Sequence, residues 1–320
     1  MKYRYLFLII LVSAFPLAGT NGQTTEAEKK LRNLDADTLM GWKKGGVATL
    51  NLAHTSLKNW ASGGQNSVAF NGIFSVYANY RNNKSVWDNS FDIGYGLLKQ
   101  SKDADFMKTD DRLDLVSKYG LEAFKNFYYA ALLNFKTQMS PGYNYPDVNN
   151  RISGFFAPAY LLAAVGLDYK PDQHFDAFIA PFTGKFTFVK DDGLSEAGAF
   201  GVTPGEKLRG EVGGYLRIVF SKNDFKEELL KNIAFTTKLD LFSNYLENPQ
   251  NIDVSWETLI ALKINKYISV TINTHLLYDD NIKIPVDRNN DGIISQYELD
   301  NPGSRVQFKE IFGVGLSYNF

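Results

Sequence analysis

The sequence contains no cysteine in its 320 residues. Disulfide bonds and thiolate metal sites are therefore excluded, and so is a lipid-anchored lipoprotein, whose mature chain starts with a cysteine. The formal net charge is only −1, which gives no electrostatic reason to expect nucleic acid as a partner. Beyond the first residues, no apolar run reaches the roughly 18 residues that a membrane-spanning helix needs. These features exclude a helical membrane protein.

Aromatic residues, in contrast, are frequent. They make up 14% of the chain, with 24 phenylalanines and 18 tyrosines, while hydrophobic residues of all kinds make up 44%. This balance is typical of a membrane β-barrel, in which only alternate residues meet lipid and aromatic rings collect at both interfaces.

The first residues have the features of a secretory signal peptide. Lys2 and Arg4 precede an apolar run over 5–15, and small and polar residues follow it. The run is too short to cross a bilayer as a helix, and no basic stop-transfer flank comes after it. We therefore expect residues 1–22 to be removed on export. Residues 23–45 are polar and charged, and we expect them to form a short periplasmic lead-in segment.

From residue 46 onward, apolar and polar residues alternate in segments that turn residues separate. Alternation with a period of two indicates β-strands, and most segments exceed the about 9 to 11 residues that a tilted strand needs to cross the hydrocarbon layer. The sequence therefore predicts an all-β fold, a transmembrane antiparallel β-barrel of about 12 strands over 46–320. The expected strands are 46–55, 67–80, 86–98, 109–121, 127–138, 154–169, 175–188, 207–220, 232–245, 252–264, 267–278 and 305–320.

The connections between these segments alternate in length, except that 246–251 is short where a long one is due. An even strand number places both termini on the side of the short turns. Bacterial outer-membrane barrels have this layout, with short periplasmic turns and longer outside loops. A soluble β-sandwich explains alternating strands but not this arrangement. We therefore expect a location in the bacterial outer membrane, with lipid as the surrounding partner. The short connections are 81–85, 122–126, 170–174 and 265–266, and the longer ones are 56–66, 99–108, 139–153, 189–206 and 279–304.

The last segment alternates throughout and places Phe312, Val314, Leu316, Tyr318 and Phe320 on one face. An ordinary edge strand of a soluble sheet is the alternative interpretation. The aromatic ending looks like the terminal strand by which bacterial barrels are targeted. We predict that Tyr318 and Phe320 form an assembly signal for the barrel-assembly machinery.

Charged residues alternate with apolar ones inside the predicted strands. Arg or Lys in lipid costs about 2 to 4 kcal/mol at the midplane, so these side chains are expected to face the lumen. Two interpretations remain open: a lumen packed with ion pairs that hold the barrel closed, and a polar pore with mixed charges at a constriction. The predicted lumen charges are Asp88, Asp92, Arg112, Asp114, Lys118, Lys136, Lys185, Arg209, Glu211, Arg217, Lys238, Asp240, Asp253, Glu257 and Lys263.

The last long loop contains the sequence pattern of a calcium loop. Residues 287–298 match D-x-[DN]-x-[DN]-G-x₅-E at every fixed position, and Gly292 permits the sharp turn that brings the ligands onto one ion. The simpler interpretation is a surface loop rich in Asn, Asp and Gly, with an unfavourable positive charge on Arg288. We predict Ca²⁺ as the one cofactor, bound by Asp287, Asn289, Asp291, the carbonyl of Ile293, Ser295 through a water molecule, and Glu298.

The sequence gives little support for an enzyme. Residues 193–197 fail the nucleophile-elbow pattern G-x-S-x-G at the last position. His275 lies on the predicted lumen face, but a catalytic triad around it needs partners that sequence alone does not place. We therefore expect no catalytic activity, with an embedded lipid-modifying enzyme as the alternative.

Three stretches resemble a known family. GWKKGG over 41–46 and LKNWASGG over 57–64 resemble the opening of a Bacteroidota family of outer-membrane barrels catalogued as a domain of unknown function, and VQFKEIFGVGLSYNF over 306–320 resembles its closing strand. The resemblance implies the fold and the location, and it brings no established activity or catalytic residue.

Three functions follow from these observations. We expect a narrow or gated channel for small polar solutes. The alternatives are a structural or accessory barrel that partners another envelope protein and the embedded enzyme. Ion conductance distinguishes the first function from the other two.

Overall fold

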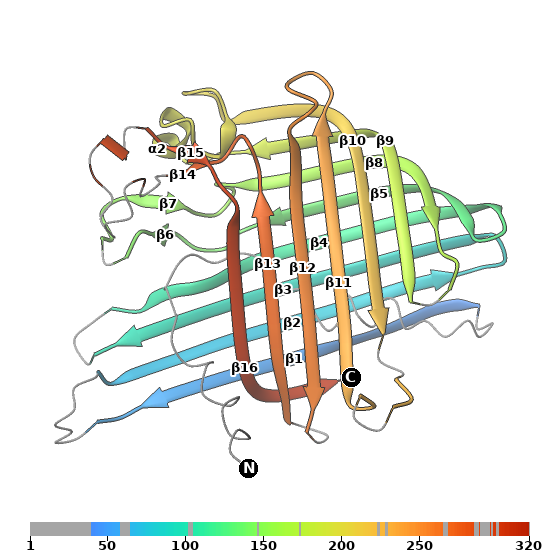
Figure 1. Ribbon diagram of the computed structural model, residues 1–320, viewed down its shortest axis with the longest axis horizontal. Helices are drawn as coiled ribbons and strands as arrows, with labels where there is room; N and C mark the ends of the chain where they lie inside the picture. Colours follow the sequence, from blue (N-terminus) through green and yellow to red (C-terminus); the bar gives the residue numbers. More distant parts are fainter. Residues whose placement is uncertain are drawn as a thin grey trace, which may run out of the picture.

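Twelve strands close into one antiparallel barrel in the computed structural model (Figure 1), as the sequence predicts. Around the barrel the strand order is β1-β16-β13-β12-β11-β10-β9-β8-β5-β4-β3-β2. The described residues are 40–57, 65–101, 105–145, 147–172, 174–222, 225–227, 230–264, 268–284, 288, 295, 297–298 and 301–319. The barrel strands are β1 (Gly41–Thr55), β2 (Ser67–Arg81), β3 (Ser85–Gln100), β4 (Met107–Phe124), β5 (Phe127–Thr137), β8 (Ala159–Tyr169), β9 (Phe175–Phe188), β10 (Leu208–Lys222), β11 (Ile233–Asn244), β12 (Ile252–Lys263), β13 (Ile268–Tyr278) and β16 (Gln307–Asn319).

The short elements all lie in the longer connections, which gather at one end of the barrel (Figure 1). We call this the long-loop end and the opposite end the short-turn end. None of the described helices is long and apolar enough to cross a membrane. The short elements are β6 (Gly142–Tyr143), β7 (Arg151–Ser153), α2 (Asp192–Glu196), η1 (Ala199–Gly201), β14 (Lys283–Ile284) and β15 (Gly303–Ser304).

The barrel starts earlier than the alternation predicts. β1 begins at Gly41, so residues 41–45, which we expected in the lead-in segment, belong to the strand and pair with β2. The Trp42 ring packs 5.4 Å from the ring of Tyr80 and 5.5 Å from that of Trp87. Two consecutive lysines after Trp42 interrupt the apolar pattern, which explains why the alternation places the start later.

Side chains alternate between a buried inward face and an exposed outward face. On β11, for example, every second residue from Ala234 to Asn244 is buried except Asp240, which is half-buried. Large apolar residues are exposed on the outward face, among them Leu52 at 69% and Phe308 at 61%. A soluble protein seldom exposes so many large apolar side chains, whereas a barrel in lipid requires them.

Candidate functional site

Charged side chains cross-link the lumen near the short-turn end. The ammonium group of Lys118 on β4 lies 2.9 Å from carboxylate oxygens of both Asp168 on β8 and Asp176 on β9. Lys170, in the turn between those two strands, lies 3.2 Å from Asp168 and 3.3 Å from Asp176. Two lysines and two aspartates therefore join three strands of the wall.

Asp88 on β3 extends this network to the strand next to β4. Its carboxylate lies 2.8 Å from Arg81 and 3.1 Å from Lys170. Burial lowers the pKa of Lys170, but the carboxylates around it raise the pKa by more, so Lys170 stays charged. Three cations and three carboxylates thus balance in what we call the inner ion cluster: Arg81, Asp88, Lys118, Asp168, Lys170 and Asp176.

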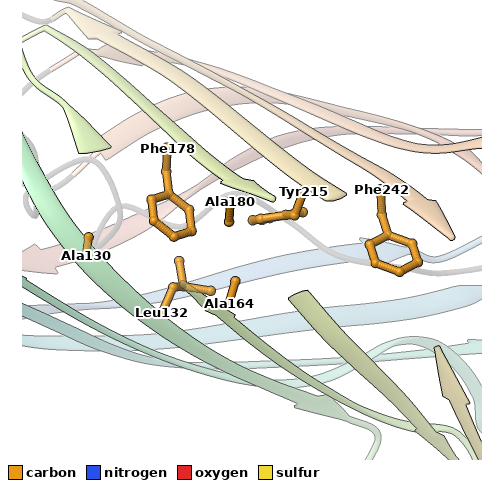
Figure 2. Close-up of a cluster of buried hydrophobic side chains, with 7 residues drawn as sticks. All are labelled: Ala130, Leu132, Ala164, Phe178, Ala180, Tyr215 and Phe242. Atoms are coloured by element: carbon orange, nitrogen blue, oxygen red, sulfur yellow. The ribbon is translucent and has the colours of Figure 1, made fainter. Parts of the chain in front are cut away.

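Apolar side chains fill the lumen beside the inner ion cluster. The Phe178 side chain is fully buried, with its ring 5.9 Å from the Lys118 ammonium and 6.3 Å from the Tyr215 ring. Figure 2 shows side chains from five neighbouring strands of the wall, β5, β8, β9, β10 and β11, gathered at this level. Apolar narrowings of this kind exclude water and ions. The apolar constriction consists of Ala130, Leu132, Ala164, Phe178, Ala180, Tyr215 and Phe242.

A cavity of about 290 Å³ lies on the other side of the constriction. Tyr215 and Phe242 belong to the constriction and also line the cavity, so the two adjoin. From the long-loop end, Phe200 of η1 and Ile282 of the last long loop complete the lining. Most of the lining surface is apolar, but charged side chains also reach the cavity. Its titratable residues include Asp111, Arg112, Lys136, Lys185, Asp240, Asp253, Glu257, His275 and Asp279.

Lys185 is held on one wall of the cavity by three carboxylates. Its ammonium group lies 2.7 Å from Asp253, 3.3 Å from Asp279 and 3.5 Å from Glu211. The Phe242 ring lies 5.2 Å away and adds a cation–π contact. This fixed position keeps a cation at the cavity surface without leaving a buried charge unpaired.

Two further cation–carboxylate pairs lie on the adjoining strands β10, β11 and β12. The Tyr215 hydroxyl donates to Asp240 over 2.6 Å, and Arg217 lies 3.7 Å from the same carboxylate. Lys238 lies 3.2 Å from Glu257, and both side chains are 2% exposed. Because cations and carboxylates alternate and pair, the lumen combines many hydrogen-bonding groups with little net charge.

His275 lies in the cavity wall next to a hydroxyl and a carboxylate. Its Nε2 is 2.9 Å from the Ser255 Oγ and 4.0 Å from Glu257 Oε1. In a catalytic triad the serine and the carboxylate contact opposite nitrogens of the imidazole. Here both approach the same nitrogen, so Glu257 is not placed as the orienting carboxylate of such a triad.

Folded loops form an outer cap over the long-loop end. Its apolar centre contains Ala157 from the β5–β8 connection and Val189, Leu194 and Val202 from the β9–β10 connection, all buried. The same two connections are joined by Arg151, whose guanidinium donates to Asp191 over 2.7 Å. These contacts tie two separate loops into one body.

Arg209 and Asp280 extend the outer cap to the β11–β12 and β13–β16 connections. Arg209 donates to the Gly201 carbonyl over 2.8 Å and to Glu247, in the β11–β12 connection, over 2.7 Å. Asp280 accepts from the Ser304 hydroxyl over 3.0 Å and from the Asn251 amide over 2.8 Å. The hydrogen bond from Ser304 and, to a lesser extent, the other donors hold the pKa of Asp280 below its ordinary value.

The predicted lumen charges lie on the inward face, with one difference at a strand end. Lys263 is exposed because it is the last residue of β12, where the inward face opens at the barrel mouth. Arg209 reaches the outer cap instead of the cavity. Asp92, Arg112, Asp114, Lys118, Glu211, Arg217, Lys238 and Glu257 are buried, and Asp88, Lys136, Lys185, Arg209, Asp240 and Asp253 are half-buried.

The predicted calcium loop and assembly signal lie largely outside the described residues. Glu298, the last predicted ligand, accepts from the backbone N–H and the hydroxyl of Ser295 over 2.9 and 2.8 Å. Among the described residues, no group of His and acidic side chains is arranged to hold a metal ion. Tyr318 belongs to β16, but its side chain is not described. Asp287, Asn289, Asp291, Ile293 and Phe320 lie outside the described residues.

Several lumen residues were missed by the sequence analysis. Asp168 and Asp176 alternate with apolar neighbours in predicted strands, so the signal that identifies the other charges applies to them as well. Lys170 gives no such signal because it lies in a turn. Asp110 and Asp111 are consecutive and both buried, which simple alternation forbids. A bulge in β4 and loop residues that donate to Asp111 explain the exception.

Comparison with known families gives one match. The model of a family described as a protein of unknown function (DUF3078) matches residues 52–143. The match covers less than half of the chain and agrees with a resemblance to an uncharacterised family, while the Bacteroidota origin stays a prediction. No curated protein matches the sequence.

Solved structures with similar folds are outer-membrane proteins. The translocator domain of the autotransporter NalP from Neisseria meningitidis is 8% identical, with a TM-score of 0.35 over 90% of this chain and 91% of that chain. An outer membrane channel from Pseudomonas putida is 12% identical, with a TM-score of 0.37 over 89% and 97%. The siderophore receptor PirA from Pseudomonas aeruginosa is 11% identical, with a TM-score of 0.28 over 88% and 56%. These similarities concern the fold alone.

Proposed function

We propose that this protein is a bacterial outer-membrane barrel that gates a narrow pathway for small polar solutes. The observation that carries the proposal is the order of the lumen, in which a cavity reached by charged side chains, the apolar constriction and the inner ion cluster follow one another. Exposed apolar side chains around the wall support a membrane location, since in water they would be an aggregation hazard.

The cavity favours solutes with little net charge. Cations of its wall contact carboxylates, as Lys185 contacts Asp253, so the wall offers hydrogen-bond donors as well as acceptors. A neutral or zwitterionic solute exchanges its hydration for these groups at low cost. In this proposal the apolar constriction narrows the path beyond the cavity, and the Phe178 ring limits passage there.

Conductance in planar bilayers tests the gate with two matched variants on one strand. Phe178 fills the constriction, whereas Phe182 is 77% exposed on the outward face of the same strand. We expect low conductance for the wild-type protein, higher conductance for Phe178→Ala and no change for Phe182→Ala. Phe178→Leu serves as a milder variant, with heat-modifiable mobility on gels as the check of folding.

The accessory barrel is favoured by one observation, the complete pairing of the inner ion cluster, which suits a barrel that never opens. Equal and negligible conductance for the wild-type protein and both Phe178 variants would support that function instead. The proposal assigns no catalytic role to His275. A lipid-modifying activity lost in His275→Ala would contradict this assignment.

A further inference from the structure

The wall of the barrel is not equally closed all the way round. Among the described residues, β1 and β16 pair at only four positions, from Val47 opposite Asn319 to Leu50 opposite Leu316. Each of the other eleven strand pairs has at least ten paired positions. Figure 1 shows the two strands leaving this short contact in different directions, β1 alongside β2 and β16 alongside β13.

The separation begins at Asn51, on the side of the long-loop end. A Cβ on Gly315 would collide with the Asn51 side chain, so the two strands are still in contact there. Farther out, the inward-facing Ala53 is exposed, although the inward face within the other strands is mostly buried. The lumen is therefore accessible from the side between β1 and β16.

Polar side chains lie behind this gap. Lys309 on β16 donates to Asp110 on β4 over 3.3 Å, and Asn71 on β2 donates to the same carboxylate over 3.3 Å. Because β16 and β4 are separated by three strands around the wall, the Lys309 contact crosses the lumen.

The outward flanks of the gap are apolar. Leu52 on β1 is 69% exposed, and Phe312 and Val314 on β16 are 59% and 52% exposed. Between these flanks, and within the part of the chain that the structure describes, the backbone groups of β1 that point away from β2 are not paired with β16 beyond Leu50. Open sheet edges do not persist in hydrocarbon without hydrogen-bonding partners. A polar head group supplies such partners, and an alkyl chain does not.

We propose that the part of the β1–β16 seam from Asn51 to Thr55 is a lateral opening that holds one amphiphile of the membrane. Its polar head group lies between the strands, next to Asn51, Asn71 and Lys309, and its acyl chains stay in the bilayer beside Leu52 and Phe312. This inference rests on the membrane location proposed above, but it is independent of whether solutes pass through the constriction.

Fluorescence quenching by lipid tests the occupant, since the chain lacks cysteine and accepts a single labelled position. Ala53→Cys places a bimane label at the opening, Leu277→Cys places it on the cavity wall, and Leu52→Cys places it on the outward face. The full-length variants are refolded into vesicles of phosphatidylcholine that carries a nitroxide on its choline group.

We expect quenching at position 53 to exceed that at position 277 several-fold. Equal quenching at these two positions, with strong quenching at position 52, overturns the lateral opening and leaves the membrane location intact. Absence of quenching at position 52 overturns the membrane location and the opening together.

Disulfide formation tests the gap itself without lipid quenchers. Ala53 and Ala69 are paired neighbours on β1 and β2, at the roughly 4.5 to 5.5 Å between Cα atoms that a disulfide accepts. On oxidation we expect the Ala53→Cys/Ala69→Cys variant to form its disulfide and Ala53→Cys/Gly313→Cys to form little. Equal formation in both variants means that the seam is closed, and it overturns the proposal.

Discussion

Phe178 and Phe182 lie four residues apart on β9 but face opposite sides of the barrel wall, with 0% and 77% of their surfaces exposed. In a regular strand, residues four apart share a face. The registers with β8 and β10 both pass over Pro181, which is therefore an extra residue in β9. Proline has no N–H to lose at such a bulge. The bulge thus turns one ring into the lumen and the other toward the outside.

The two phenylalanines are expected to contribute unequally to stability. Phe178→Ala leaves a void in the apolar constriction and should lower the free energy of unfolding by about 3 to 5 kcal/mol. Phe182→Ala removes a ring from the outward face and should cost less. Urea unfolding of the barrel in vesicles measures both, and similar losses would contradict the placement of Phe178 in a packed lumen.

The inner ion cluster should be sensitive to loss of one cation. Lys118→Met leaves the buried carboxylates of Asp168 and Asp176 short of a partner, and breaking such a pair costs about 3 to 5 kcal/mol. Lys207→Met is the control because Lys207 pairs with Asp192 at the exposed surface, where ion pairs contribute little. Unfolding curves that shift equally for the two variants would contradict a structural role for the cluster.

The outer cap should loosen in acid. The N–H of Leu194 and then the guanidinium of Arg151 hold the pKa of Asp191 below its ordinary value. The stabilisation is therefore fully present above the unfolded pKa of about 3.9 and is lost as pH falls through the lower folded value. We expect proteolysis in the β9–β10 connection, with an acid-active protease, to accelerate as pH falls below about 4. In Asp191→Asn this acceleration should be absent, and its persistence would disprove the assignment to Asp191.

Calcium binding by residues 287–298 stays a prediction. The match to the calcium-loop pattern leads us to expect binding with a dissociation constant of about 10⁻⁴ to 10⁻³ M, as in extracellular modules. Calorimetry on the purified barrel should show this heat, and Asp287→Ala and Glu298→Ala should both abolish it. No heat at millimolar calcium for the wild-type protein would leave 287–298 as a surface loop without a metal.

The sequence predicts the strands of this barrel well because membrane and lumen impose opposite demands on alternate residues. All twelve predicted segments correspond to strands, although β1 starts at Gly41 and β8 starts at Ala159. The latter differs because residues 154–158, which we expected in the strand, belong to the outer cap connection. Period-two patterns report which side a residue faces, but they do not report where a chain leaves the wall.

The contacts of the lumen were beyond prediction from one sequence. Alternation places Lys118 inside, but it does not say that Asp168 and Asp176, fifty or more residues later, supply its partners. The bulge at Pro181 reverses the inward face within β9, so a pattern applied to the whole strand assigns one of the two phenylalanines wrongly. Such contacts depend on the stagger of the strands around the barrel. That stagger is fixed only when all strands pair into the closed wall, so the pattern within one strand does not contain it.

The short contact between β1 and β16 also determines how the wall opens and closes in time. These strands lie at opposite ends of the chain, so closing the seam requires the largest loop closure in the molecule and is expected to come last in folding. Each hydrogen bond contributes a net free energy of about 0.5 to 1.5 kcal/mol. Only the bonds at four paired positions close the barrel, and without them the wall would be a curled sheet with two free edges. Fluctuations of the wall are therefore concentrated at this one seam, and the backbone amides of Val47 to Leu50 should exchange with solvent deuterium long before those in the middle of β10.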